Sequence, residues 1–357
     1  MPVSITFAAN ALRTTTTFLV CLLFLSAPPE VAAASGLPFG PGVSEVTVAD
    51  DRADRPLAGN VWYPTATPEK HRRADKSKVW QMAEADPDGV AAEGSFPLLV
   101  ISHGMYGNTF NQAWLGSALA RRGYIVAMVN HPGTSTFLRN ADHARELWER
   151  PVDLSRLITF LLERSALADR IDKSKVFAAG HSLGGYTVML LAGARFDAGL
   201  YKNLCIGGET NVVCPVLKGW SVAETDADRR DMAVSRKDVR VKKIASMDLG
   251  GTPVLSRQSL AAIETPVLVL GSGRADMLDQ DVESRMLVSL LPTASARHVE
   301  LADAGHFDFM GVCKPEGFEI LKEHEPGDEI VCIKGTAERE AQHARIITEL
   351  VGFFGKE

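Results

Sequence analysis

The sequence predicts a doubly wound α/β fold built around a mostly parallel sheet. Short apolar runs bounded by turn residues recur through the chain, and continuous runs of this kind suit strands buried on both faces. Helix-like segments lie between the runs, as in folds that place helices on both sides of a sheet. The chain has 357 residues, of which 46% are hydrophobic, so it can bury one large core and we expect one main domain.

The expected strands and helices follow one another in a regular order. Two early strands are predicted at 44–48 and 58–63, and a long polar connection follows them at 65–94. The later strands are predicted at 96–102, 125–130, 175–179, 242–249, 266–271 and 298–301. The helices are predicted around 113–122, 152–165, 188–192, 282–290 and 339–354.

Two segments interrupt this order. Residues 194–238 carry many charges and are too long for a simple connection, so we expect them to form a small cap insertion over the site. Trp220 lies in this segment and is a candidate for an apolar substrate wall. Residues 313–335 are expected to form a second excursion beside it.

The N-terminal segment has the features of an export signal. An apolar run at 18–25 follows Arg13, and a stretch of small residues at 31–35 comes after it. Because the run is too short to cross a bilayer of about 30 Å, we interpret 1–34 as a signal peptide and 35–357 as the folded domain. The alternative is an uncleaved N-terminal helix. The first interpretation implies a secreted or periplasmic protein without a stable membrane anchor.

The charge of the chain excludes some partners. The formal net charge is −6, and the lysines and arginines form no long run. This distribution argues against a nucleic-acid surface and against a polybasic membrane patch.

Four cysteines lie beyond the predicted signal peptide: Cys205, Cys214, Cys313 and Cys332. An even number in an exported chain is compatible with two disulfides, for which three pairings exist. We predict the short-range pairing, Cys205 with Cys214 and Cys313 with Cys332, because each loop has few strand or helix signals and gains most from a covalent link. Four free thiols are the alternative. Metal binding is disfavoured because no Cys-x-x-Cys or histidine cluster accompanies the cysteines.

Ser182 stands at the apex of a predicted sharp turn between a strand and a helix. The turn reads Gly180, His181, Ser182, Leu183, Gly184. The two glycines allow close backbone approaches that a Cβ would prevent, and the turn presents the serine hydroxyl above the sheet. The pattern alone is weak, but its position after a buried strand makes Ser182 a candidate nucleophile.

A serine nucleophile needs a base and a group that orients the base. Among the nine histidines, His306 follows a late strand and comes after every acid candidate, so it is the predicted base. Two carboxylates compete for the third role. Asp276 lies just beyond the predicted strand 266–271, and Asp248 ends the strand before it. We favour Asp276 and keep Asp248 as the alternative acid.

Acyl transfer also needs donors for the negative oxygen of the tetrahedral intermediate. The backbone N–H of Leu183, at the start of the helix after the serine, is the expected first donor. The second is expected from Met105, because the preceding Gly104 lets the backbone turn inward after the strand 96–102. His103 is expected to be a structural hydrogen-bonding group, and His131 is expected in a rim turn.

With these residues in place, the chain resembles the α/β-hydrolase superfamily, and within it the secreted bacterial dienelactone-hydrolase-like and platelet-activating-factor acetylhydrolase-like proteins. The resemblance is carried by the segments 55–64, 102–104, 131–133, 180–185 and 305–313. It implies hydrolysis of carboxylic esters through an acyl-serine intermediate, with no metal or organic cofactor. Dienelactone hydrolases have a cysteine nucleophile where this chain has Ser182, so their substrate does not transfer. The acetylhydrolases imply Asp248 as the acid, whereas many other α/β-hydrolases imply Asp276.

The predicted function is therefore that of a serine esterase or lipase-like hydrolase, acting on short-chain or lipid-like esters as small-molecule or lipid substrates. A peptidase or amidase on the same scaffold is the alternative enzyme, because acyl-serine chemistry does not fix the leaving group. A non-catalytic binding protein with a hydrolase fold is the alternative from another class. Neither the ester nor the oligomeric state follows from the sequence.

Overall fold

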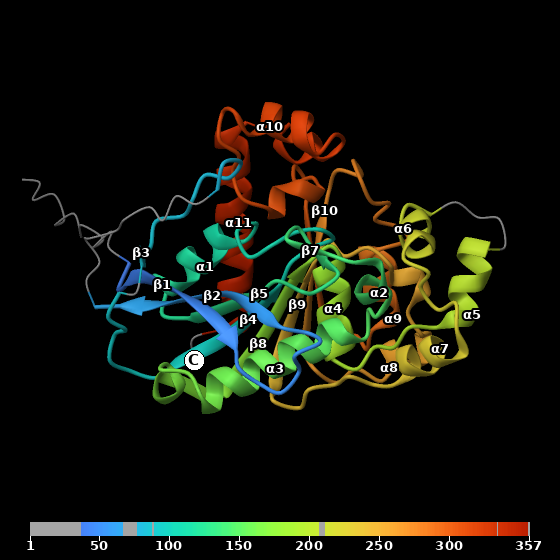
Figure 1. Ribbon diagram of the computed structural model, residues 1–357, viewed down its shortest axis with the longest axis horizontal. Coiled ribbons are helices and arrows are strands. Elements are labelled where there is room, and N and C mark those ends of the chain that lie inside the picture. The colour runs from blue at the N-terminus through green and yellow to red at the C-terminus, as the bar shows by residue number, and fades with distance from the viewer. Residues whose placement is uncertain (1–36, 67–76, 88, 207–210, 334, 356–357) are drawn as a thin grey trace, which may run out of the picture. The chain divides into compact units, whose positions relative to one another are not determined.

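The computed structural model describes residues 37–66, 77–87, 89–206, 211–333 and 335–355 (Figure 1). The predicted signal peptide and the start of the predicted domain at residue 35 lie outside these ranges. Within them the chain forms a nine-stranded sheet in the order β11-β10-β9-β8-β4-β5-β2-β1-β3. The strands are β1 (Gly40–Val48), β2 (Leu57–Thr65), β3 (Asp86–Pro87), β4 (Phe96–Ser102), β5 (Ile125–Val129), β8 (Ile171–His181), β9 (Val241–Met247), β10 (Val267–Ser272) and β11 (Ala296–Leu301).

The sheet is mostly parallel, as predicted. Strands β5, β4, β8, β9, β10 and β11 pair in parallel, while β2 is antiparallel to both β1 and β5. The central strand β4 is buried along its whole length. Its Leu98 and Val100 join one apolar core, whereas Leu99 and Ile101 join the other. This division explains why the strand reads as a continuous apolar run in the sequence.

Helices cover both faces of the sheet. On one face α1 (Ala113–Ala120) and α11 (Thr336–Phe354) contribute to the same core, through side chains such as Leu115 and Ile346. On the other face lie α3 (Glu149–Glu163), α4 (Leu183–Leu191), α8 (Arg257–Ala261) and α9 (Ser284–Leu290). The predicted fold class is therefore confirmed. The short strand β3, the two-stranded β6 (Thr134–Ser135) and β7 (Leu138–Arg139), and helices α2 (Ala141–Arg145) and α8 were not predicted.

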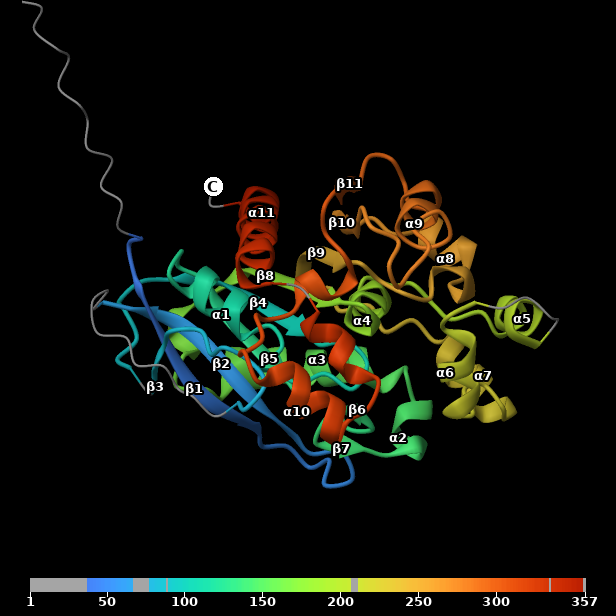
Figure 2. The same ribbon diagram turned by 90° about the horizontal axis from the view of Figure 1, so that it is seen from above.

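The two irregular segments contain short helices and both disulfides. The first holds α5 (Ala198–Tyr201), a π-helical turn (Lys202–Ile206), α6 (Cys214–Gly219) and α7 (Asp226–Ala233). The second holds α10 (Gly317–His324) and a 3-10 helix (Asp328–Cys332). Figures 1 and 2 place α5, α6 and α7 together on one side of the sheet and α10 apart from them. The disulfides are Cys205–Cys214 and Cys313–Cys332, which is the predicted pairing.

None of the helices in the described ranges combines the length and the apolar character that crossing a bilayer would require.

Candidate active site

Ser182 lies in a sharp turn between β8 and α4 and has a strained backbone. Its φ is 56° and its ψ is −121°, a region that residues with a side chain rarely adopt. The flanking glycines make the turn possible. A Cβ on Gly180 would lie 2.0 Å from the carbonyl oxygen of Gly184, and a Cβ on Gly184 would lie 2.0 Å from that of Ser102. The turn predicted from the sequence is therefore present, and no larger residue fits at either glycine.

Ser182, His306 and Asp248 form one hydrogen-bonded chain. His306 begins a 3-10 turn (His306–Phe309) that follows β11, and its side chain is buried. Its Nδ1–H donates to Asp248 Oδ2 over 2.6 Å, which leaves Nε2 as an acceptor. The Ser182 hydroxyl donates to this Nε2 over 3.1 Å. The imidazole is thus held in the tautomer that can take a proton from the serine.

Asp276, the favoured acid, does not contact the His306 ring, whereas the alternative Asp248 does. Asp248 follows β9 directly and is fully buried against the imidazole. Asp276 lies farther along the loop after β10, where its side chain is 37% exposed. There its Oδ1 accepts a hydrogen bond from the backbone N–H of His306 over 3.0 Å. Asp276 therefore holds the backbone of the histidine loop instead of the ring.

The second oxygen of Asp248 has its own donors. Oδ1 accepts from the backbone N–H of Ser272 over 2.8 Å and from Gln280 Nε2 over 2.9 Å. Burial alone would raise the pKa of Asp248. The hydrogen bond and charge of His306, together with the Ser272 N–H, instead hold that pKa below its usual value. Asp248 is therefore ionised at neutral pH. Nothing in the sequence pattern singles out Gln280.

His181, the residue before the serine, supports the histidine loop from below. Its Nε2–H donates to the backbone carbonyl of His306 over 2.9 Å. Burial lowers the pKa of His181 to about 3, and the nearby His306 ring adds to this effect. His181 is thus a neutral hydrogen-bond donor at neutral pH, and its contact fixes the position of the His306 backbone.

The two expected oxyanion donors lie beside Ser182. Leu183 is the first residue of α4, and Gly104, which precedes Met105, passes so close to the serine that a Cβ on it would lie 3.3 Å from Ser182 Cβ. Within the described ranges, the backbone N–H groups of Met105 and Leu183 have no hydrogen-bond acceptor. Both donors are therefore free to bind a ligand oxygen.

The loop that carries Met105 is held by His103. The backbone N–H of His131 donates to His103 Nε2 over 3.0 Å, so the ring proton must be on Nδ1. That Nδ1–H donates to the carbonyl of Gly104 over 2.7 Å. In a trans peptide the C=O and the following N–H point in opposite directions. The contact therefore turns the Met105 N–H away from His103.

A buried arginine also supports this loop. Arg150, in α3, donates from Nη2 to the His103 carbonyl over 2.5 Å and to Ser102 Oγ over 3.1 Å. Its other nitrogens donate to Thr187 Oγ1, over 2.8 Å, and to Thr134 Oγ1. Burial lowers the pKa of Arg150 to about 9, so the guanidinium remains charged at neutral pH.

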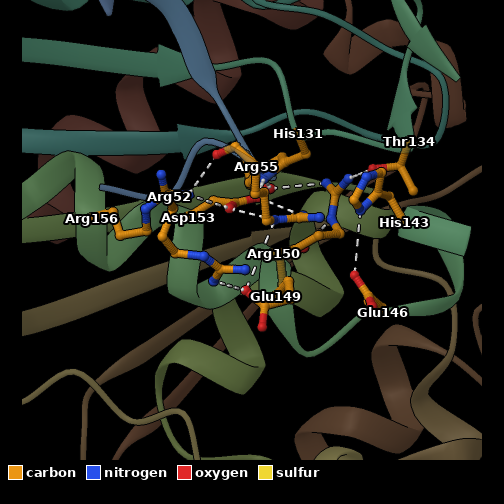
Figure 3. Close-up of polar contacts among 12 residues, drawn as sticks. Arg52, Arg55, His131, Thr134, His143, Glu146, Glu149, Arg150, Asp153 and Arg156 are labelled. Atoms are coloured by element: carbon orange, nitrogen blue, oxygen red, sulfur yellow. Dashed lines mark hydrogen bonds and ion pairs between the residues drawn. The ribbon is translucent and has the colours of Figure 1, made fainter. Parts of the chain in front are cut away.

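The network around Arg150 contains one central carboxylate, Asp153 (Figure 3). Arg55 donates to both of its oxygens, each over 2.8 Å, and His131 Nδ1–H donates over 2.9 Å. Burial, followed by the charge on Arg150, lowers the pKa of both His103 and His131 well below the usual value. His131 begins the predicted turn, because its carbonyl accepts from the backbone N–H of Thr134 over 3.3 Å, and its side chain is fully buried.

Two cavities meet at Ser182 and His306. One has a volume of about 100 Å³ and is bounded by the first irregular segment, including Val216 and Trp220. The other has a volume of about 380 Å³ and is bounded by Tyr106, Phe137 and the second irregular segment. In the described part of the chain, no group of three or more histidine, cysteine, aspartate or glutamate side chains could hold a metal ion.

Comparisons with known proteins agree with this geometry. The model of the prolyl oligopeptidase family matches residues 109–206, which include Ser182. A cutinase of Thermobifida cellulosilytica is 29% identical over 142 residues, which cover 34% of this chain and 51% of the relative. The bis(hydroxyethyl) terephthalate hydrolase of Streptomyces coelicolor is 27% identical over 137 residues, which cover 38% of this chain and 34% of the relative. The chain thus spans about half or less of these curated relatives.

A solved structure is similar over most of the chain. The ferulic acid esterase from Streptomyces cinnamoneus aligns with a TM-score of 0.59 and 19% identity, over 91% of each chain. Together with the strand order and the position of the serine turn, this similarity shows that the chain has the α/β-hydrolase fold.

Proposed function

We propose that this protein is a serine hydrolase that cleaves carboxylic esters through an acyl-serine intermediate. One observation carries the proposal. A single buried imidazole, His306, is hydrogen-bonded through one nitrogen to Ser182 and through the other to Asp248. In the proposed roles Ser182 is the nucleophile, His306 is the general base and acid, and Asp248 orients the ring and stabilises its protonated form.

The geometry accounts for each step of the reaction. Ser182 Oγ attacks the ester carbonyl carbon while its proton moves to His306 Nε2. The carbonyl oxygen becomes negative and accepts hydrogen bonds from the N–H groups of Met105 and Leu183. As the carbon–oxygen bond to the alcohol breaks, His306 returns the proton to the leaving oxygen. A water molecule then attacks the acyl-serine while His306 takes a proton from that water. When the bond to Ser182 breaks, His306 returns the proton to Ser182 Oγ and the carboxylic acid leaves.

Esters are favoured over peptides by the relatives in the sequence and structure comparisons. Their names are those of a cutinase, a terephthalate ester hydrolase and a ferulic acid esterase. The match to the prolyl oligopeptidase family covers the serine turn, a part that ester-cleaving and peptide-cleaving enzymes of one scaffold share. The experiment that tests the proposal therefore includes an amide substrate.

The proposal also states that the protein is exported and that a cap lies over the active site. The predicted signal peptide at 1–34 and the two disulfides together favour a secreted or periplasmic location. The segment 194–238 is proposed as the cap because its α6 bounds the smaller cavity beside Ser182. We also propose that the protein belongs with the dienelactone-hydrolase-like proteins that its sequence resembles.

The test combines labelling with a pair of substrates. A fluorophosphonate probe should add its phosphonyl group to the peptide that contains Ser182, as measured by mass spectrometry. The enzyme should hydrolyse p-nitrophenyl butyrate at least a hundredfold faster than the matching anilide. Labelling elsewhere in the chain would contradict the assigned nucleophile, and a faster anilide reaction would favour the peptidase alternative.

A further inference from the structure

We propose that the two cavities divide the substrate at the bond that is cleaved. The smaller cavity binds a short apolar acyl group, and the larger cavity binds a bulky alcohol with ring-shaped and polar parts. This inference rests on the proposed ester hydrolysis and names the class of ester. Tyr106 and Trp220 form the divider between the two cavities.

The smaller cavity suits a short apolar chain. Its walls include Leu183, Tyr186, Val216, Leu217 and Trp220, and its volume is about 100 Å³. An apolar cavity of about 150 Å³ binds one benzene ring. By that measure the smaller cavity holds a chain of about four carbon atoms. It has no charged wall residue among those described that could pair with a charged acyl group.

The larger cavity suits a larger and more polar group. Its volume is about 380 Å³, and aromatic side chains such as Phe137 and Phe307 line it. Asn108, Arg139 and Glu325 add hydrogen-bonding groups to its walls. Such a wall fits an alcohol that presents both a ring face and hydroxyl or ether oxygens.

The divider is built from residues far apart in the sequence. Tyr106 lines the larger cavity and Trp220 lines the smaller one. Trp220 Nε1–H donates to the Tyr106 hydroxyl over 2.8 Å, and the two rings meet edge to face with centroids 5.8 Å apart. The guanidinium of Arg139 lies 4.7 Å from the centroid of the Tyr106 ring and pairs with Glu325 over 3.0 Å.

This arrangement fixes Tyr106 in a strained position. Its φ is 50°, which is costly for an aromatic residue and persists only where neighbouring contacts hold it. Trp220 of the first irregular segment contacts Tyr106 directly, and Glu325 of the second holds Arg139 against it. A disulfide closes each segment: Cys205–Cys214 beside α6 and Cys313–Cys332 around α10. The divider therefore has a defined position relative to Ser182.

The order of the reaction decides which group binds where. The acyl group stays attached to Ser182 through both steps, whereas the alcohol leaves and water takes its place. The departing oxygen and the incoming water must both reach His306. The larger cavity, with polar walls, admits water to His306, while the smaller apolar cavity stays filled by the acyl chain. The opposite orientation would place a bulky acid in the larger cavity.

Two isomeric esters distinguish these orientations. Naphthylethyl acetate has a bulky alcohol and a short acid, and methyl naphthylpropanoate has a bulky acid and a short alcohol. The proposal predicts a kcat/KM at least about tenfold higher for the first, the scale on which apolar pockets discriminate size. It also predicts that kcat/KM falls by about tenfold or more from naphthylethyl butyrate to naphthylethyl octanoate.

Single substitutions assign each preference to its cavity. Val216→Ala enlarges the smaller cavity and should reduce the penalty for octanoate severalfold. Val239→Ala is the matched control, because Val239 is 74% exposed and away from both cavities. Phe137→Ala, on the exposed rim of the larger cavity, should reduce the preference for the naphthyl alcohol and leave the acyl-length profile unchanged.

The outcomes separate this inference from the proposed function. A faster reaction of methyl naphthylpropanoate, or an acyl-length profile that Val216→Ala leaves unchanged, would overturn the assignment of the cavities while ester hydrolysis stands. No hydrolysis of any ester by the folded protein, together with no labelling of Ser182, would overturn the proposed function itself.

Discussion

Two buried polar clusters lie near Ser182 and differ in what their ionisable groups can do. The carboxylate cluster consists of Asp248, His306, Gln280 and Ser272, and the guanidinium cluster consists of Arg150, His103, Asp153, His131 and Arg55. In the first cluster His306 touches the serine hydroxyl and lines both cavities. In the second, both histidines are held neutral and contact backbone or other buried groups.

The difference shows what a buried titratable group needs in order to act in catalysis. A buried titratable group can take part in proton transfer only where it meets the nucleophile and the space for substrate. The guanidinium cluster meets neither. Two of its hydrogen bonds end on the carbonyl groups of His103 and Gly104, so it fixes the path of the loop that carries the Met105 N–H.

The strongest test of the comparison is the pair Ser182 and His306. We expect Ser182→Ala and His306→Ala each to lower kcat by about 10⁶-fold, because the two groups act as a unit, and the double variant to be little worse. The measurement is kcat for p-nitrophenyl butyrate. Losses that multiply in the double variant would show that the two residues act independently.

The two carboxylates near His306 should differ sharply. Asp248→Asn is nearly isosteric but removes the charge that faces the imidazolium, so we expect kcat to fall by about 10⁴-fold. Asp276→Asn leaves the imidazole contacts intact and affects the contacts of Asp276 to the backbone N–H of His306 and to Arg274, so we expect a loss of less than about tenfold. The same esterase assay measures both variants. Equal losses would contradict the placement of Asp248 as the orienting acid.

Removal of Arg150 should affect stability and kcat together. Arg150→Met leaves several buried oxygen atoms without a donor, so we expect the free energy of unfolding to fall by about 3 kcal/mol or more. The loop that carries the Met105 N–H (the oxyanion loop) also loses a support. We therefore expect kcat to fall by about 10²-fold with a smaller change in KM, as when one oxyanion donor is lost.

A matched control for this variant is Arg52→Met, at the exposed margin of the same region. Arg52 pairs with Asp54 and Glu149, and its side chain is 34% exposed, so we expect a loss below about 1 kcal/mol. Urea unfolding and steady-state kinetics in the cold, where both variants are folded, give the two quantities. A full kcat in folded Arg150→Met would refute its role in holding the loop.

Acid should destabilise the fold through its buried histidines. The pKa values of His103 and His131 are lowered in the folded state, so below about pH 6.5 the unfolded chain binds protons that the folded chain does not. Stability should therefore fall as the pH drops, by about 1.4 kcal/mol per pH unit for each buried histidine. Urea unfolding between neutral pH and pH 5 measures this slope.

The histidine contributions can be separated by substitution. His103→Gln should make the slope of stability against pH shallower by the contribution of one histidine, about 1.4 kcal/mol per pH unit. His324→Gln, at an exposed position on α10, should leave the slope unchanged. A slope that His103→Gln does not alter would mean that the ring is not held neutral by burial.

Local sequence features determined much of this protein. The turn around Ser182 follows from glycines at positions where a Cβ would meet backbone atoms. The parallel strands follow from apolar runs buried on both faces, and the disulfides join cysteines separated by 9 and 19 positions. In each case the cause lies within a short stretch of chain, where residue type and backbone geometry are directly linked.

The remaining features depended on tertiary structure because they join residues whose separation in sequence says nothing about their distance in space. Asp248 and Asp276 both follow strands that end near His306, and only the paths of their loops decided which side chain reached the ring. The contacts of Arg150 with the oxyanion loop and of Trp220 with Tyr106 likewise bring distant segments together. Side-chain packing across the closed core set these contacts, and no local pattern encodes them.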